Sequence, residues 1–294
     1  MAVLAYAASY FARGWLAGHQ CFALYGGLVL LEAVARLMFA LAVAVGLAHG
    51  QAAVALGMAA APLFSLVVVP LAFARRTAPP DGPRREEGDE LGLGRGGRFA
   101  VAVLAIMLAE QTLLNAAVLT TDLTATDAAA AGIVFNALLI ARAPLQLFQA
   151  IQGSLLPHLT GLEASGDRDA RRHAVRVTML AIAGFAGAVA LGLIVVGPWA
   201  MNVLFDEAAT YGRWGLALVA FGMGFHLMAG TLNQAALARD HAGRAALAWL
   251  AVAAVFVGWL LLPLVNDPLL RAEAGYCGAA ALLCGLLAVA YRRA

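Results

Sequence analysis

All nineteen basic residues of the chain are arginines, and most of them lie in every second gap between long apolar stretches. The arginine-rich gaps are residues 75–98, 168–176, 239–244 and 292–293. The gaps between them contain only Arg213 and Arg271. Positive charge beside a membrane-spanning segment resists translocation, so cytoplasmic loops carry such an excess. The pattern therefore predicts a multi-pass protein of the inner (plasma) membrane, with the arginine-rich gaps and the C-terminus in the cytoplasm.

The composition agrees with a membrane protein and excludes several other classes. Hydrophobic residues make up 63% of the chain and charged residues 12%, against about 45–50% and 25% in soluble domains. The net charge of +2 follows from the arginine topology, and nothing resembles a nucleic-acid-binding surface. The three cysteines form no disulfide or metal pattern, and no HExxH, GxSxG or Walker A motif occurs. We therefore expect no enzyme, no catalytic residues, no metal and no cofactor.

Apolar windows predict how often the chain crosses the membrane. A bilayer core about 30 Å thick needs roughly 20 apolar residues in a helix. Eight such windows lie at residues 22–48, 52–74, 99–121, 129–156, 174–196, 212–236, 243–265 and 274–291. Eight crossings from a cytoplasmic Arg13 return the C-terminus to the cytoplasm, as the arginine pattern requires. Residues 1–12 are too short to span and look like the end of a helix, and Pro198 is expected to begin a short helix along the outer surface.

The longest polar segment, residues 75–98, divides the chain. Its proline, glycine and mixed charge cannot bury enough apolar area to fold alone. We expect it to be a flexible cytoplasmic linker. It separates a front piece at 1–74, with the end of one helix and two spans, from a six-helix piece at 99–294.

Ionisable and amide side chains at membrane depth are the candidate functional residues, because each needs a partner or water there. Glu32 and Arg36 are four residues apart and share one helix face. They form either an intrahelical ion pair that lets both charges stay buried or part of a transport-cavity lining. Glu110, Gln111 and Asn115 mark the third span; Gln111 and Asn115 share a face, and Glu110 is turned about 100° away from it.

The fourth span has the most informative polar stripe. Arg142, Gln146 and Gln149 fall at i, i+4 and i+7 on a helix that also contains Pro144. A buried arginine facing an aqueous cavity suits an anionic group such as a diphosphate. The alternative is an arginine whose guanidinium reaches the membrane surface.

The sixth span carries Asn233, His226 and Gln234. Asn233 is a cavity candidate, although amides in membrane helices often serve only as interhelical hydrogen bonds. A packing role is favoured over proton transfer for His226. Glu273, in the last outer gap, is expected to be solvated.

Several stretches resemble polysaccharide-export flippases. The run LLIARAPLQLFQAIQGSLLPHLTGLEASGDRDARR, at 138–172, is similar to their eighth membrane helix and following loop, with Arg-x-Pro and then Ser-Leu-x-Pro-x-Leu. The segment EQTLLNA, at 110–116, resembles the seventh helix, which precedes the eighth in that family. The segment GTLNQAALARDHAGRAAL, at 230–247, resembles the loop between the tenth and eleventh helices. YFARGWLAGHQCFALYGGLVLLEAVARL, at 10–37, resembles the end of the fourth helix and the fifth.

This resemblance is to the multidrug/oligosaccharidyl-lipid/polysaccharide exporter superfamily. It implies two six-helix lobes around a central cavity, and flipping of a lipid-linked saccharide between leaflets by alternating access. The partners it implies are membrane lipids and that saccharide substrate. Relative to the family, the chain is N-terminally truncated by about three and a half helices, so we expect it to be inactive alone unless a partner chain supplies them.

Three other functions remain open. A drug/cation antiporter of the same superfamily would favour acidic coupling residues in the first lobe. A membrane enzyme acting on polyprenyl lipids should gather histidines or carboxylates at one membrane face, and in this sequence they are scattered. A non-transporting membrane fragment or scaffold is the third.

Overall fold

The computed structural model describes residues 2–18, 21–46, 56–57, 59–61, 63, 93–124, 130–139, 159, 168–205, 211–262 and 264–293. All regular structure within these residues is helical. The chain forms two compact units, Met1–Glu87 and Gly88–Ala294. The boundary between them falls inside the segment 75–98, which the sequence assigns to a linker.

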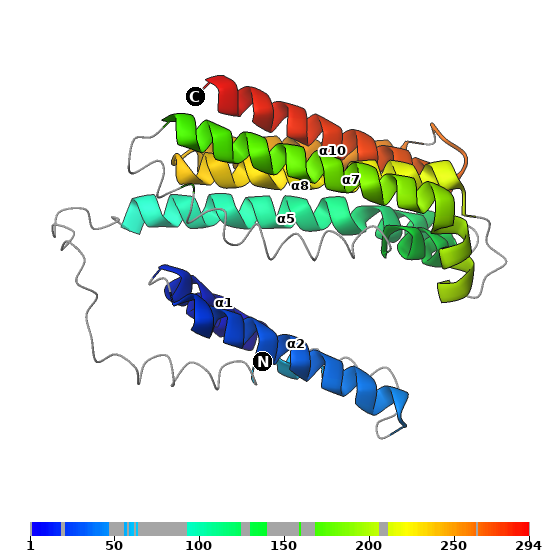
Figure 1. Ribbon diagram of the computed structural model, residues 1–294, viewed down its shortest axis with the longest axis horizontal. Helices are drawn as coiled ribbons and strands as arrows, with labels where there is room; N and C mark the ends of the chain where they lie inside the picture. Colours follow the sequence, from blue (N-terminus) through cyan, green and yellow to red (C-terminus); the bar gives the residue numbers. More distant parts are fainter. Residues whose placement is uncertain are drawn as a thin grey trace. The chain divides into compact units, whose positions relative to one another are not determined.

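The first unit contains the helices α1 (Ala2–Gly18) and α2 (Phe22–Ala44), which pack as a hairpin (Figure 1). Leu16 of α1 and Leu28 of α2 are both buried in the contact. Much of the remaining surface of α2 is apolar and exposed, including Leu30 and Leu37. An apolar helix with an apolar exposed face is typical of a segment surrounded by lipid.

The second unit is a helix bundle. Its long helices are α5 (Leu93–Thr124), α7 (Arg168–Phe205), α8 (Arg213–Ala238), α9 (Ala242–Leu261) and α10 (Pro268–Arg293). A shorter apolar helix, Ala130–Leu139, belongs to the same unit. Helix α8 packs against α7 and α10, and α9 packs against α5 and α10. Consecutive residues of α8 are buried, so it is enclosed on several sides and forms the centre of the bundle.

Glycines allow α8 to approach its neighbours closely. A Cβ at Gly222 would lie 2.8 Å from Cδ1 of Tyr276 and 3.0 Å from the Cα of Cys277, both in α10. A Cβ at Gly224 would overlap the side chain of Ala186 in α7. Because lipid is as apolar as the helix surfaces, such close backbone packing is a main source of helix association in membranes. Gly222 and Gly224 thus serve the packing of α8, whereas Gly184, Gly187 and Gly192 of α7, which the sequence also suggests as packing positions, have open space around them.

Six helices are long and apolar enough to cross a membrane, so the protein is membrane-embedded. The six segments are Leu24–Val43, Gly97–Thr124, Arg172–Phe205, Arg213–Ala238, Ala242–Leu261 and Pro268–Arg293. They coincide with six of the eight predicted crossings. The other two, at 52–74 and 129–156, lie largely outside the described residues, although the parts described are helical.

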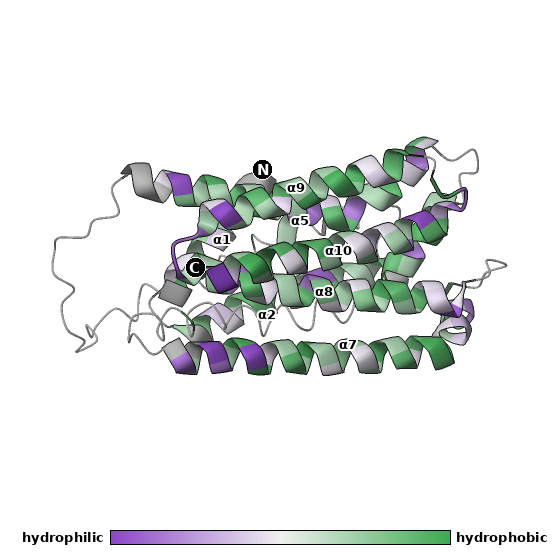
Figure 2. Cartoon of the chain, turned by 90° about the horizontal axis from the view of Figure 1, so that it is seen from above, coloured by the Kyte–Doolittle hydropathy of each residue, from purple (hydrophilic) through white to green (hydrophobic). Residues whose placement is uncertain are grey.

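The arginine-rich ends of the second unit gather at one end of its bundle (Figure 1). The start of α5, the start of α7, the turn between α8 and α9 and the end of α10 all lie there. Figure 2 shows the corresponding hydrophilic ends of α7 and α10 beside long hydrophobic stretches. Arg239 also links the ends of two helices, since its Nη1 donates to the carbonyl of Tyr291 at 3.4 Å.

Arg271, at the opposite end of the bundle, has a different role. Its Nε donates to the carbonyl of Val265 at 2.8 Å and its Nη1 to that of Leu260 at 3.3 Å. The carbonyls of the last helical turn have no partner within their own helix. Arg271 therefore caps the C-terminal end of α9, which explains an arginine outside the arginine-rich gaps.

Three predictions about the helices were wrong. Helix α5 begins at Leu93, so the last residues of the predicted linker are helical. Helix α7 continues through Pro198 to Phe205, where a separate surface helix was expected. Glu273 is not a solvated loop residue: it lies in α10 with 4% of its surface exposed, because its carboxylate occupies the space that Gly215 leaves free.

Candidate functional site

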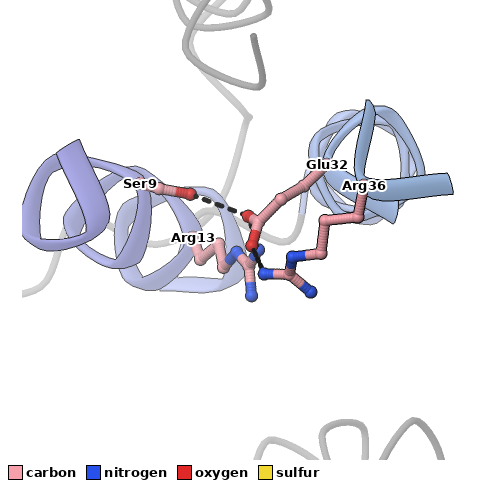
Figure 3. A network of polar contacts seen from close by, with 4 residues as sticks. All are labelled: Ser9, Arg13, Glu32 and Arg36. Carbon is pink, nitrogen blue, oxygen red and sulfur yellow. Dashed lines mark hydrogen bonds and ion pairs between the residues drawn. The ribbon is translucent and has the colours of Figure 1, made fainter. Parts of the chain in front are cut away.

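The first unit holds a cluster of charged side chains around Glu32 (Figure 3). Glu32 lies near the middle of α2 and is 2% exposed. Its Oε1 accepts a hydrogen bond from Arg36, one turn further along the same helix, and its Oε2 accepts one from Arg13 of α1. The hydroxyl of Ser9 donates to the same Oε2 at 3.4 Å. One carboxylate is thus held from two helices.

The predicted pair of Glu32 and Arg36 is confirmed, but the cluster is larger than the sequence indicates. Arg13, interpreted from the sequence only as a cytoplasmic charge, lies within α1. Its side chain is 17% exposed, against 45% for that of Arg36. Two guanidiniums around one carboxylate leave the cluster with a formal charge of +1. Such a charge within an apolar hairpin favours anions nearby.

The second unit holds a separate group of polar side chains in its core. Nε2 of His226 in α8 lies 3.5 Å from Oε1 of Glu110 in α5. The side chain of His226 is 4% exposed and that of Glu110 is 29% exposed. Each residue stands at the middle of its span, Glu110 in Gly97–Thr124 and His226 in Arg213–Ala238. An ionisable pair at that depth is costly and is a functional candidate on physical grounds.

Aromatic rings enclose His226. The ring of Tyr276 in α10 stacks on it with centroids 6.1 Å apart, and the ring of Trp249 in α9 meets it edge-on at 5.6 Å. The indole Nε1 of Trp249 in turn donates to Oδ1 of Asn233 at 3.2 Å. His226 and Asn233 are therefore joined through Trp249, and four helices contribute to the group. The Nδ1 of His226 is buried with no hydrogen-bond partner among the described residues.

The remaining candidates in α5 lie elsewhere. Nδ2 of Asn115 donates to the backbone carbonyl of Gln111 at 2.9 Å and to its Oε1 at 3.1 Å. Gln111 is exposed, and these contacts stay within one helix. The two hydrogen bonds therefore pair Gln111 with Asn115 rather than with the group around His226.

Arg142, Gln146 and Gln149 lie outside the described residues. Their predicted polar stripe stays a prediction from the sequence. Among the residues that are described, no three His, Cys, Asp or Glu side chains gather closely enough to hold a metal ion.

Sequence reasoning missed the contacts that join different helices. Arg13 was treated only as a topological charge, and Ser9 gave no signal. His226 was favoured as a packing residue, and its stacking on Tyr276 agrees with that, but its approach to Glu110 was not expected. The placement of both residues at mid-span was the one signal that could have suggested the pair.

Comparison with known proteins adds no assignment: no protein-family model, curated protein or solved structure matches this chain.

Proposed function

We propose that this protein is a membrane transporter that moves a lipid-linked oligosaccharide or polysaccharide precursor across the inner membrane by alternating access, in a two-lobe exporter fold. The observation that carries the proposal is the cluster of Arg13, Glu32 and Arg36. Burying ions in an apolar hairpin costs several kcal/mol per ion before pairing. Ionisable residues within membrane spans are rare and usually mark a substrate or ion pathway.

The sign of the cluster suits the substrate class. Lipid-linked saccharides carry a phosphate or diphosphate between the lipid and the sugar. Guanidinium groups bind phosphate oxygens through paired donors. The cluster contains two guanidiniums and one carboxylate. Of the two arginines, Arg36 is the more exposed and therefore the more accessible to a phosphate.

Two sequence features support the same function. The stretches at 10–37, 110–116, 138–172 and 230–247 resemble polysaccharide-export flippases. The arginine-rich ends shared by α5, α7, α8, α9 and α10 would face the cytoplasm under the positive-inside rule. The C-terminus, with Arg292 and Arg293, would then be cytoplasmic.

The test is a leaflet assay in liposomes with the protein purified from its own membrane, so that any partner chain remains bound to it. A polyprenyl-diphosphate saccharide with a fluorescent label on its sugar is placed in both leaflets, and a membrane-impermeant quencher is added outside. A transporter moves labelled lipid from the inner to the outer leaflet, where the quencher reaches it. The fluorescence then falls by more than the fraction that the outer leaflet held at the start. A trace identical to that of protein-free liposomes would refute the proposal.

Arg142→Ala is the informative variant, because the sequence places this arginine in the fourth apolar stretch, where it would meet the phosphate. We expect it to abolish the inner-pool loss while the protein still inserts. Arg293→Ala is the matched control, since it removes an exposed arginine from the end of α10. Full activity of Arg142→Ala at equal protein would remove Arg142 from the site.

A second candidate, a drug/cation antiporter, is favoured by the pair of Glu110 and His226. An acidic residue in the middle of a span is a natural cation site. The antiporter would exchange a lipophilic cation such as ethidium against protons in the same liposomes and leave the saccharide probe unmoved.

A further inference from the structure

The pair of Glu110 and His226 is the only place in the middle of the second unit's described long helices where a carboxylate and an imidazole meet. Their facing atoms, Oε1 and Nε2, are 3.5 Å apart. An imidazole and a carboxylate are both proton acceptors, and histidine is the usual proton-transfer group of proteins near neutral pH. Binding or release of a single proton by this pair therefore changes the charge at the centre of this bundle.

Few other groups can take part in that exchange. Residues 178–205 of α7 and 245–261 of α9 contain no ionisable side chain, and Glu110 is the only one in residues 99–121 of α5. Helix α10 contributes Tyr276, stacked on His226, and Cys277, whose backbone packs on α8. Its Glu273 lies against Gly215, three helical turns from His226. Among the described residues of these helices, no other charged side chain lies beside the pair.

Binding of one proton changes the net charge of the pair. Without the added proton, a carboxylate faces a neutral imidazole and the pair carries one negative charge. With it, the pair is neutral overall, either as carboxylate and imidazolium or as carboxylic acid and imidazole. Coulomb energies grow as the local dielectric falls, so in a core closed by Tyr276 and Trp249 this change of charge acts strongly on the neighbouring helices. The side chain of Glu110 is 29% exposed, against 4% for that of His226.

We propose that Glu110 and His226 form a proton-binding site at mid-membrane, and that protons bound there drive the substrate transport of this protein. The first half stands on the geometry of the pair alone. The second half rests on the proposed transport function.

The coupling follows from what each state allows α5 and α8 to do. With one proton bound, the two side chains can separate as carboxylic acid and imidazole, both neutral. Without it, separation leaves a carboxylate in an apolar core with no partner, which is strongly disfavoured. Proton binding therefore permits movement between the two helices, and proton release holds them together.

The proton site is tested by infrared difference spectroscopy on the full chain in lipid nanodiscs, between alkaline and acidic pH. We expect the carbonyl stretch of a protonated carboxyl group to appear on acidification, to vanish in Glu110→Gln and to titrate over a different pH range in His226→Gln. Glu273→Gln is the matched control, because it removes another buried carboxyl group and should leave this component in place. A Glu110→Gln spectrum identical to that of the unmodified protein would overturn the proposal.

A measurement on the unmodified chain covers the case in which Glu110→Gln fails to fold. Nitrogen-15 NMR of labelled histidine, with His226 assigned from His226→Gln, reports both ring nitrogens. We expect the His226 ring signals to shift over the same pH range as the carboxyl band, because the charge of the facing Glu110 changes. Ring signals that stay constant over the whole pH range in which the other histidines titrate would overturn the site.

Coupling is tested in the leaflet assay with an imposed pH gradient. One proton per cycle lets a gradient of one pH unit support at most about a tenfold gradient of substrate. We expect the gradient to speed transport by the unmodified protein and to have no effect on Glu110→Gln or His226→Gln. Equal rates with and without the gradient in the unmodified protein would overturn the coupling. If no condition moves the saccharide probe, the proposed function fails, while the proton site is still decided by the spectra.

Discussion

Replacing Glu32 by glutamine should destabilise the α1–α2 hairpin more than any single change at its arginines. Glu32→Gln keeps the volume of the side chain but removes the only negative charge in the cluster. Arg13 is then left 17% exposed with no counter-charge in that cluster, and Arg36 45% exposed. Removing one partner of a buried ion pair costs roughly 3–5 kcal/mol. Because one oxygen of glutamine still accepts a hydrogen bond, we expect the lower end, about 3 kcal/mol.

The destabilisation caused by replacing each of the two arginines should be larger for the less exposed one. Arg13→Gln should cost roughly 1–3 kcal/mol, the usual range for a hydrogen bond to a charged group. Arg36 is nearly half exposed, so its ion pair is screened, and Arg36→Gln should cost about 0.2–1 kcal/mol. The double variant Glu32→Gln with Arg13→Gln should be less destabilised than the sum of its single changes, because the two groups are coupled.

Trp15 offers a local probe, since it is the only tryptophan within residues 1–87. With fluorotryptophan incorporated, its fluorine NMR signal follows unfolding of the hairpin as sodium dodecyl sulfate is added to the protein in micelles. Trp15→Phe assigns the signal. An Arg36→Gln variant as destabilised as Glu32→Gln would refute the reasoning, and so would a Glu32→Gln cost near zero.

Three further predictions concern packing, the turn between α8 and α9, and pH. Gly222→Ala should cost about 1–3 kcal/mol in thermal unfolding, because its Cβ would press on Tyr276, whereas Gly187→Ala, with open space around its Cβ, should cost nothing; equal effects would contradict the packing. Asp240 has a φ of 59° at the end of α8, so Asp240→Gly should stabilise by about 1 kcal/mol and Asp240→Val should destabilise; the opposite order in the same unfolding assay would refute this. Burial, followed by neighbouring arginines, lowers the pKa of His241 from its ordinary value of 6.5. The unfolded chain then binds more protons than the folded one, so the stability that the neutral ring contributes is present above pH 6.5 and is lost as the pH falls below it. In His241→Gln, the free energy of unfolding, measured at several pH values, should fall less steeply as the pH is lowered. An unchanged dependence on pH would contradict this prediction.

The sequence predicts what depends on local spacing. Apolar windows located six helices because the length of a spanning helix is set by the bilayer. The i, i+4 spacing predicted that Glu32 and Arg36 share a face, and the structure confirms their contact. The arginine gaps predicted which helix ends belong together, and the second unit gathers them at one end of its bundle.

Contacts between distant residues could not be predicted in this way. Glu110 and His226 are 116 positions apart, and only the packing of the bundle, in which α9 contacts both α5 and α8, brings them together. The burial of Glu273 depends on the missing side chain of Gly215, which no pattern in α10 reveals. Pro198 lies in α7 where a break was expected, and nothing in the local sequence distinguishes a proline that ends a helix from one that a helix accommodates.

The most direct test of the account compares two probes in the leaflet assay. One carries its labelled saccharide on a polyprenyl diphosphate, and the other carries the same saccharide on the same lipid through a neutral linkage. The account predicts that the unmodified protein moves the diphosphate probe and leaves the neutral one in its leaflet, because the arginines recognise the anionic group. Equal movement of both probes, or of neither, would contradict the claim that this protein transports an anionic lipid-linked saccharide.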